Sequence, residues 1–419
     1  MSEITIDGAT YTLDNAGNRT AKTDQRAAVI SNYGYDAIYE LTGVTQGTNT
    51  TESYTYDPVG NRLSSLGVSP YNVNVSNQLT STPSTSYTYD HNGNTLTKID
   101  STGTTTYTWD FENRLTSVTL PGTGGTVTFR YNPFSRRIQK SFTTGANPPT
   151  TTTTNYLYDG DNGIEEIDPS GSVLARYSDS LGIDEPLAML RSGTTSYYHA
   201  DGLGSVTSLS NAAGALSQTY TFDSFGKQTA LSGSLTNSFR FTAREFDTET
   251  SLYFYRARYY DPNAGRFLAE DPNDQGTLGE ATNLYRYAEN SPANYADPYG
   301  LFTRKSGAVP WPSLPIQALL DCIEYKTDLK LVVTSTSDSH PPTDLHTLGG
   351  AVDLRYPPDP NDVKHILCAA KDCGAGYALN EQTKRPESPH WDGAHIHLQI
   401  PLSKSGKHGD LPSGNCCEK

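Results

Sequence analysis

The sequence predicts an all-β repeat shell followed by a small α+β domain. A ten-residue Tyr-rich pattern recurs from the N-terminus to about residue 190, and the 28 Tyr that accompany it favour strands. Histidine and cysteine are scarce in this part, because seven of nine His and all five Cys lie after residue 301. The change in composition predicts a domain boundary at that point.

Residues 1–190 form a tandem repeat with clear copies such as YTLDNAGNRT at Tyr11, YTYDPVGNRL at Tyr54 and YTYDHNGNTL at Tyr87. Each copy alternates apolar and polar residues and then turns at an Asp- or Asn-Gly-containing tetrad, which is a β-hairpin signal. A single hairpin cannot bury its own face, so neighbouring copies must stack. We therefore predict one continuous antiparallel sheet to about residue 250, with inward Tyr rings and Asp-capped turns.

The next region, residues 191–301, ends in SLYFYRARYYDPNAGRFLAEDP and NLYRYAENSPANYADPYGL. These motifs closely resemble the core that closes the shell of Rhs and YD-repeat proteins. The resemblance implies a hollow β-shell and an autoproteolytic cut just after DPYGL, between Leu301 and Phe302, which frees a C-terminal toxin. It also implies that Asp271 and Asp297 perform the cut.

A pair of carboxylates suits this chemistry, because two close carboxylates do not both ionise readily. One can then remain protonated as an acid while its partner activates water. An isolated Asp-Pro is common in turns that have no catalytic role, but the match over the whole segment favours the catalytic interpretation. The repeats are too few to close a shell, so we expect the chain to be the C-terminal part of a larger protein or an orphan tip fragment.

The C-terminal region, residues 302–419, is called the tip below. SLPIQALLDCIEY has apolar residues at helical spacing over 313–325, and LKLVVTST over 329–336 is typical of a buried strand. AVDLR and HIHLQIP alternate as strands do, which puts His395 and His397 on one face. Together these patterns predict a small α+β domain.

The two segments LHTLGGAVD and AHIH resemble the motifs HxxGxAxD and HxH of D-Ala-D-Ala metallopeptidases, lysostaphin-like enzymes and the hedgehog domain. The resemblance implies Zn²⁺ held by His346, Asp353 and His397, with His395 beside the metal. Three protein ligands leave a fourth position for water, whose pKa zinc lowers to about 7.

The general base is the less determined part of this site. Asp392 is the first choice and Glu387 the second. An alternative alignment with a WDxxH motif makes Asp392 the base and His395 the ligand, and leaves His397 outside the site. The sequence leaves both alignments open.

These motifs predict a polymorphic toxin fragment with a zinc metallopeptidase tip that cuts bacterial cell-wall peptides. The expected partners are that substrate, a cognate immunity protein and a secretion-system component. The net charge of −15 and the absence of a Lys/Arg cluster in the tip predict no nucleic-acid partner. A nuclease tip and a non-catalytic zinc-binding adhesion domain are the alternatives.

No stretch of the sequence is apolar enough for a secretory leader or a membrane span. We therefore expect delivery by a specialised secretion system and action in the periplasm or cell wall of a target bacterium. Five cysteines confined to the tip are compatible with an oxidising compartment.

Overall fold

The computed structural model describes residues 7–180, 182–272, 283–301, 303–305, 323, 332–335, 351–355, 360–372, 377–381 and 395–399. The chain folds as two compact units. The first contains residues 1–272 and 280–301, and the second contains residues 273–279 and 302–419. The predicted boundary at residue 190 lies within one strand of the first unit, Pro186–Arg191.

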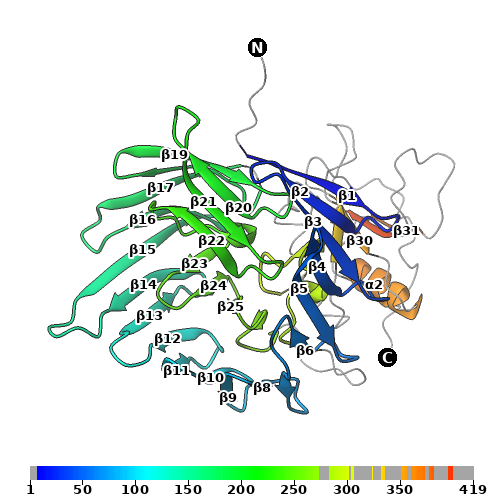
Figure 1. Ribbon diagram of the computed structural model, residues 1–419, viewed down its shortest axis with the longest axis horizontal. Coiled ribbons are helices and arrows are strands. Elements are labelled where there is room, and N and C mark those ends of the chain that lie inside the picture. The colour runs from blue at the N-terminus through cyan, green and yellow to red at the C-terminus, as the bar shows by residue number, and fades with distance from the viewer. Residues whose placement is uncertain are drawn as a thin grey trace. The chain divides into compact units, whose positions relative to one another are not determined.

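The repeats of the first unit form two antiparallel sheets in its described part, in which strands that are consecutive in sequence are also neighbours (Figure 1). The first sheet contains β1 (Ala9–Leu13), β2 (Arg19–Asp24), β3 (Val29–Tyr35), β4 (Leu41–Gln46), β5 (Asn49–Tyr56) and β6 (Arg62–Ser65). The second contains β7 (Asn72–Val73), β8 (Leu79–Thr82), β9 (Thr85–Tyr89), β10 (Thr95–Asp100), β11 (Gly103–Trp109), β12 (Leu115–Thr119), β13 (Thr126–Tyr131), β14 (Arg137–Thr143), β15 (Thr151–Asp159), β16 (Asn162–Ile167), β17 (Val173–Asp179), β18 (Pro186–Arg191), β19 (Thr194–Ala200), β20 (Val206–Ser210), β21 (Leu216–Phe222) and β22 (Gln228–Gly233).

The prediction of one continuous sheet to about residue 250 is therefore wrong in two respects. The ladder breaks between β6 and β7, where Ser65 and Val68 exchange both of their backbone hydrogen bonds at 2.9 Å in a tight turn. Pro70 follows and has no N–H to continue the ladder. At the other end, β22 stops at Gly233.

Most repeat turns are closed by their Asp or Asn residue, as predicted. Asp57 Oδ1 accepts hydrogen bonds from the backbone N–H groups of Val59 and Asn61 at 3.0 and 2.8 Å. Gly60, at φ +78°, donates its N–H to the Asp57 carbonyl, and this left-handed conformation is why the position favours glycine. The same pair of side-chain bonds is made by Asp14, Asp90, Asp110, Asn132, Asp168, Asp201, Asn211 and Asp223.

The aromatic residues of the repeats have two roles. The first Tyr of several copies is buried, as in Tyr54, Tyr107 and Tyr220. The aromatic residue just before the turn donates a hydrogen bond to a main-chain carbonyl of the preceding repeat. Such bonds run from Tyr56 to Leu41, Tyr89 to Leu79, Trp109 to Thr95, Tyr131 to Leu115 and Tyr158 to Arg137.

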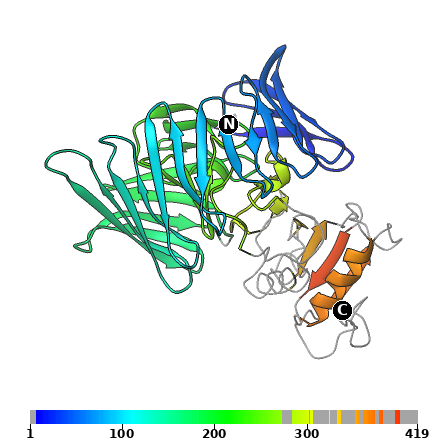
Figure 2. The same ribbon diagram turned by 90° about the horizontal axis from the view of Figure 1, so that it is seen from below.

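The inner segment (residues 237–272 and 283–301) packs against the concave side of the second sheet. Figure 1 shows β23, β24 and β25 within the curve of this sheet, and Figure 2 shows the same sheet from a second direction. Leu252, Phe254 and Tyr259 form one buried cluster with residues of β11 to β13. The segment contains η1 (Phe241–Ala243), β23 (Glu245–Asp247), β24 (Leu252–Tyr255), β25 (Arg258–Asp261), β26 (Arg266–Phe267), η2 (Ala288–Asn290) and β27 (Tyr295–Ala296).

The described part of the second unit contains strands in the order β28-β29-β30-β32-β31 and one helix, α2. Strands occur where AVDLR and HIHLQ predicted them and within the predicted strand 329–336, whereas the predicted helix 313–325 lies outside the described residues except for Ile323. The bounds are β28 (Thr303–Lys305), β29 (Val332–Ser335), β30 (Ala351–Arg355), α2 (Pro360–Asp372), β31 (Tyr377–Glu381) and β32 (His395–Gln399). Among the described residues, no helix has the length and apolar character needed to cross a membrane.

Candidate self-cleavage site

The structure brings the predicted aspartates, Asp271 and Asp297, to one guanidinium. Arg258 Nη2 lies 2.8 Å from Asp271 Oδ2 and 3.4 Å from Asp297 Oδ2. All three side chains are buried, with exposed fractions of 2% for Arg258 and Asp297 and 9% for Asp271. The two carboxylates are 26 residues apart in sequence, so the fold rather than local sequence creates this cluster.

Asp297 also contacts the backbone where the chain is predicted to be cut. Its Oδ1 accepts a hydrogen bond from the Leu301 N–H at 3.0 Å. Arg258 Nε donates to the Gly300 carbonyl at 2.5 Å. Arg258 and Asp297 therefore connect the aspartate pair to the end of the DPYGL segment. Phe302, on the other side of the predicted cut, lies outside the described residues.

The turn between β24 and β25 positions this segment. Gly300 adopts φ +69°, and a Cβ there would lie 2.6 Å from the Tyr255 carbonyl oxygen, so glycine is required for this close approach. The Ala257 N–H donates to the Tyr299 carbonyl at 3.1 Å. Arg256 Nη1 donates to the Pro298 carbonyl at 2.5 Å. The peptide groups on either side of Tyr299 are therefore fixed by backbone and guanidinium donors.

A cavity of about 260 Å³ lies beside Leu301. Its lining includes Tyr158, Phe254, Arg256 and Tyr299. A space of this size holds several water molecules, since one water requires only about 10–15 Å³. Leu301 lines this space whereas Asp271, Asp297 and Arg258 do not, so the space adjoins the predicted cut rather than the carboxylates.

Arg258 was not among the predicted site residues, although it lies in the quoted motif SLYFYRARYYDPNAGRFLAEDP, which also contains Asp271. A signal was available, because two buried carboxylates at one site need a positive or hydrogen-bonding partner. An Arg in the same motif as the first Asp was the natural candidate. Sequence spacing alone did not distinguish it from Arg256, whose guanidinium binds Asp184 instead.

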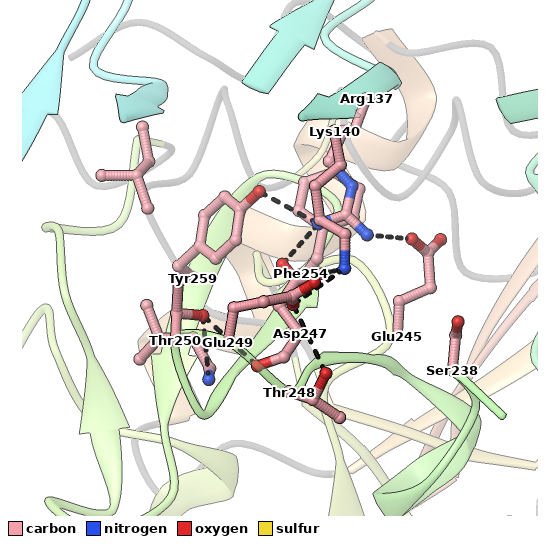
Figure 3. A network of polar contacts seen from close by, with 12 residues as sticks. Arg137, Lys140, Ser238, Glu245, Asp247, Thr248, Glu249, Thr250, Phe254 and Tyr259 are labelled. Carbon is pink, nitrogen blue, oxygen red and sulfur yellow. Dashed lines mark hydrogen bonds and ion pairs between the residues drawn. The ribbon is translucent and has the colours of Figure 1, made fainter. Parts of the chain in front are cut away.

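A second buried polar network anchors the inner segment to the sheet (Figure 3). Arg137 of β14 contacts Glu245 and lies 2.6 Å from Asp247 Oδ2. Lys140 Nζ lies 3.1 Å from both Asp247 Oδ1 and Glu249 Oε2. Although burial alone raises the pKa of Asp247, the charges of Arg137 and Lys140 hold that pKa below its usual value. The network joins β14 to β23 more than 100 residues further along the chain.

In the tip, the structure sets two of the predicted metal ligands opposite each other in neighbouring strands. The antiparallel register of β30 and β32 pairs Asp353 with His397 and Arg355 with His395. The described residues contain no group of three or more His, Cys, Asp or Glu that could hold a metal. The other predicted tip residues, His346, Asp392 and Glu387, lie outside the described part of the chain.

The fold and this site define a repeat-shell protein in which a sheet of capped hairpins encloses a Tyr-rich inner segment. A family model described as Teneurin YD-shell matches residues 15–293. The chain therefore belongs to the Teneurin YD-shell family. The match ends before the tip.

Several curated proteins are similar to the chain. The tRNA3(Ser)-specific nuclease WapA of Bacillus spizizenii is 34% identical over 283 residues, which cover 64% of this chain and 12% of the relative. The probable deoxyribonuclease RhsB of Dickeya dadantii is 29% identical over 310 residues, covering 70% of this chain and 20% of the relative. The crystal structure of TcdB2-TccC3-TEV is similar at 18% identity with a TM-score of 0.45, covering 70% of this chain and 18% of that one.

These relatives correct two predictions. The predicted zinc metallopeptidase is wrong, because the relatives are named as nucleases for tRNA or DNA. The predicted cell-wall substrate and the predicted absence of a nucleic-acid partner are wrong for the same reason. The charge argument failed because the 12 basic and 14 acidic residues of the tip give only an average, whereas phosphate binding depends on local charge.

Proposed function

We propose that the chain is part of a polymorphic toxin and that its inner segment cuts the chain after Leu301. The observation that carries this proposal is the cluster of Asp271, Asp297 and Arg258, with Asp297 bonded to the Leu301 N–H. One carboxylate takes a proton from the attacking water, and the other, in its protonated form, gives a proton to the leaving amide nitrogen as the C–N bond breaks. Arg258 positions both carboxylates and the Gly300 carbonyl.

The cut releases the tip, residues 302–419, and we propose that the tip acts on nucleic acid. The names of the curated relatives support this substrate class. Since the chain spans only about 12% of the first of these relatives, the activity of the whole protein belongs to the proposal. We also propose that the protein is delivered by a specialised secretion system and has a cognate immunity protein.

Zn²⁺ remains the proposed metal, now serving phosphodiester rather than peptide hydrolysis. The fit rests on the donor types, because imidazole and carboxylate are zinc ligands and the strand register sets Asp353 opposite His397. His346 is the proposed third ligand. A bound metal would supply positive charge for the phosphate and lower the pKa of a water molecule.

Self-cleavage is tested by expressing the full chain and sizing the products. The wild-type chain should give two pieces split after Leu301, whether or not they stay associated. Asp271→Asn and Asp297→Asn should each remain one chain, since loss of an acid or base typically costs roughly 10²–10⁴-fold in rate. Asp261→Asn is the matched control, because this Asp-Pro carboxylate lies 3.3 Å from Lys98, and it should still be cut. An intact wild-type chain, or cleavage of both variants at the wild-type rate, contradicts the proposal.

The tip is tested by incubating the full chain with total tRNA and with duplex DNA, with and without a chelator. We expect one of the two nucleic acids to be degraded, and the chelator to stop degradation. Asp353→Asn and His397→Ala should each remove both the bound zinc and the activity, because loss of one of three ligands removes most of the metal affinity. The self-cleavage control Asp261→Asn should keep both. If neither nucleic acid is degraded, the proposed substrate class is wrong.

A further inference from the structure

Within the described part of the chain, the guanidinium groups of Arg62 and Arg266 in the first unit line one pocket and have no carboxylate partner. Arg62, the first residue of β6, lies between aromatic rings, with its Cζ 4.6 Å from the Tyr54 ring centre and 4.1 Å from that of Phe225. Arg266, the first residue of β26, lies over Tyr285 at 4.7 Å. Among the described residues, neither guanidinium is within ion-pair distance of an acidic side chain.

Each guanidinium has donors left over. Arg62 Nη1 donates to the Ala264 carbonyl at 3.3 Å, and Arg266 Nη2 donates to the Asn77 carbonyl at 2.5 Å. Arg62 Nε, Arg62 Nη2 and Arg266 Nε are buried and have no hydrogen-bond acceptor among the residues that the structure describes. A buried donor on a charged group that lacks an acceptor is costly, so three such atoms at one place need an explanation.

A small pocket lies where these two side chains meet. A cavity of about 20 Å³ is lined by both guanidinium groups together with Gly60, Gly265, Asn283 and Arg286. Gly265 leaves room for Arg62, since a Cβ at this position would lie 2.4 Å from Arg62 Nη2. The space exceeds the roughly 10–15 Å³ that one water needs, so it can hold a water molecule or an ion of similar size.

The neighbouring polar groups are already engaged. The Asn283 amide donates to Asn61, and the Asn290 amide donates to Glu40 and to the Gly60 carbonyl. Arg286 contacts Glu289. Glu52 accepts from Ser224 N–H at 3.0 Å and from the Tyr54 hydroxyl at 2.8 Å. These groups do not supply the acceptor that Arg62 and Arg266 lack.

Charge distinguishes between the two occupants. Burial lowers the pKa of Arg266, and the nearby charge of Arg62 contributes to this shift. A water molecule offers an acceptor but brings no negative charge to Arg266, whereas a small anion supplies both. We propose that Arg62 and Arg266 hold a small monovalent inorganic anion such as chloride, which ties β6 to β26 inside the shell.

The test measures the thermal unfolding midpoint of the full chain in sodium chloride, bromide and gluconate at equal ionic strength. A ligand that binds only the folded state raises stability with its concentration. We therefore expect a higher midpoint in either halide than in gluconate, rising with halide concentration. Arg62→Met and Arg266→Met keep the length of the side chain and should lose this halide dependence. Arg114→Met should keep it, since Arg114 stacks over Tyr131 but is paired with Asp110 at 2.7 Å.

Crystals of the wild-type protein grown in bromide give a second measurement that does not depend on how the variants fold. An anomalous peak between Arg62 and Arg266 is expected. Equal midpoints in halide and gluconate, halide dependence that survives in both variants, or a cavity that contains only water would each overturn the proposal.

Discussion

The repeats and the inner segment use polar side chains over very different sequence distances. In the repeats, each turn acid binds backbone groups two and four residues away, as Asp57 does with Val59 and Asn61. In the inner segment, Asp247 binds Arg137 of β14 across 110 residues, and Arg258 binds Asp297 across 39. The turns of the repeats are therefore stabilised by contacts within one turn, whereas the inner segment is stabilised by contacts between residues that are far apart in sequence. The candidate cleavage site lies in the second kind of structure.

The largest effect on stability is expected where a long-range network is broken. Arg137→Met removes the guanidinium from Glu245 and Asp247 and leaves buried carboxylates with fewer partners. Such a change costs about 3–5 kcal/mol of the free energy of unfolding, which a urea titration measures. Arg176→Met is the matched control, because Arg176 binds Glu165 at 2.5 Å but is 57% exposed.

The control should cost no more than about 1 kcal/mol, since exposed ion pairs contribute little. If the two variants lose the same free energy, the inner segment is held by its apolar contacts and not by the Arg137 network. Local and long-range polar contacts would then contribute equally to the free energy of unfolding.

The difference in sequence distance explains what could be predicted from the sequence. The hairpins, their turn caps and the aspartate pair were predictable, because alternation, turn residues and a contiguous motif are local signals. The break at Ser65–Val68 was not predicted, since the repeat continues past it in sequence. Arg258 was missed because its partners are 13 and 39 residues away. The substrate class was missed because an average charge does not report a local surface.

An intermediate effect is expected at Asp223, a half-buried repeat cap beside Glu52 of the first sheet. Burial, together with the nearby Glu52, raises the pKa of Asp223 to about 7. The folded state therefore binds a proton that the unfolded chain releases near pH 4, so stability falls as pH rises from about 4 to about 7. Asp223→Asn keeps the capping oxygen and should flatten this part of the profile.

The measurement is the free energy of unfolding at pH 5 and at pH 8 for the wild type and the variant. Glu52→Gln removes the neighbouring charge and should reduce the fall without abolishing it. A variant profile as steep as that of the wild type would show that Asp223 behaves like the other caps, and that its position at the junction of the sheets has no electrostatic consequence.

The smallest effect on the free energy of unfolding is expected at an ordinary turn cap. Whether the losses from two such caps add up is more informative than the size of either loss. Asp57→Ala removes the acceptor of two backbone N–H groups. By analogy with helix caps, this loss costs about 0.5–2 kcal/mol of the free energy of unfolding. Asp57→Asn should cost little, because Asn132 and Asn211 cap equivalent turns. Asp168→Ala, in a turn of the second sheet, should cost a similar amount. Local contacts that share no partner are additive within about 0.3–0.5 kcal/mol, so the double variant should lose the sum of the two. In the inner segment, Asp247→Leu combined with Arg137→Met should instead lose clearly less than the sum, because the second change removes a carboxylate that the first left without its guanidinium. Urea titrations of both double variants measure this difference, and additivity in both cases would mean that the inner segment is built from independent contacts, as the repeats are.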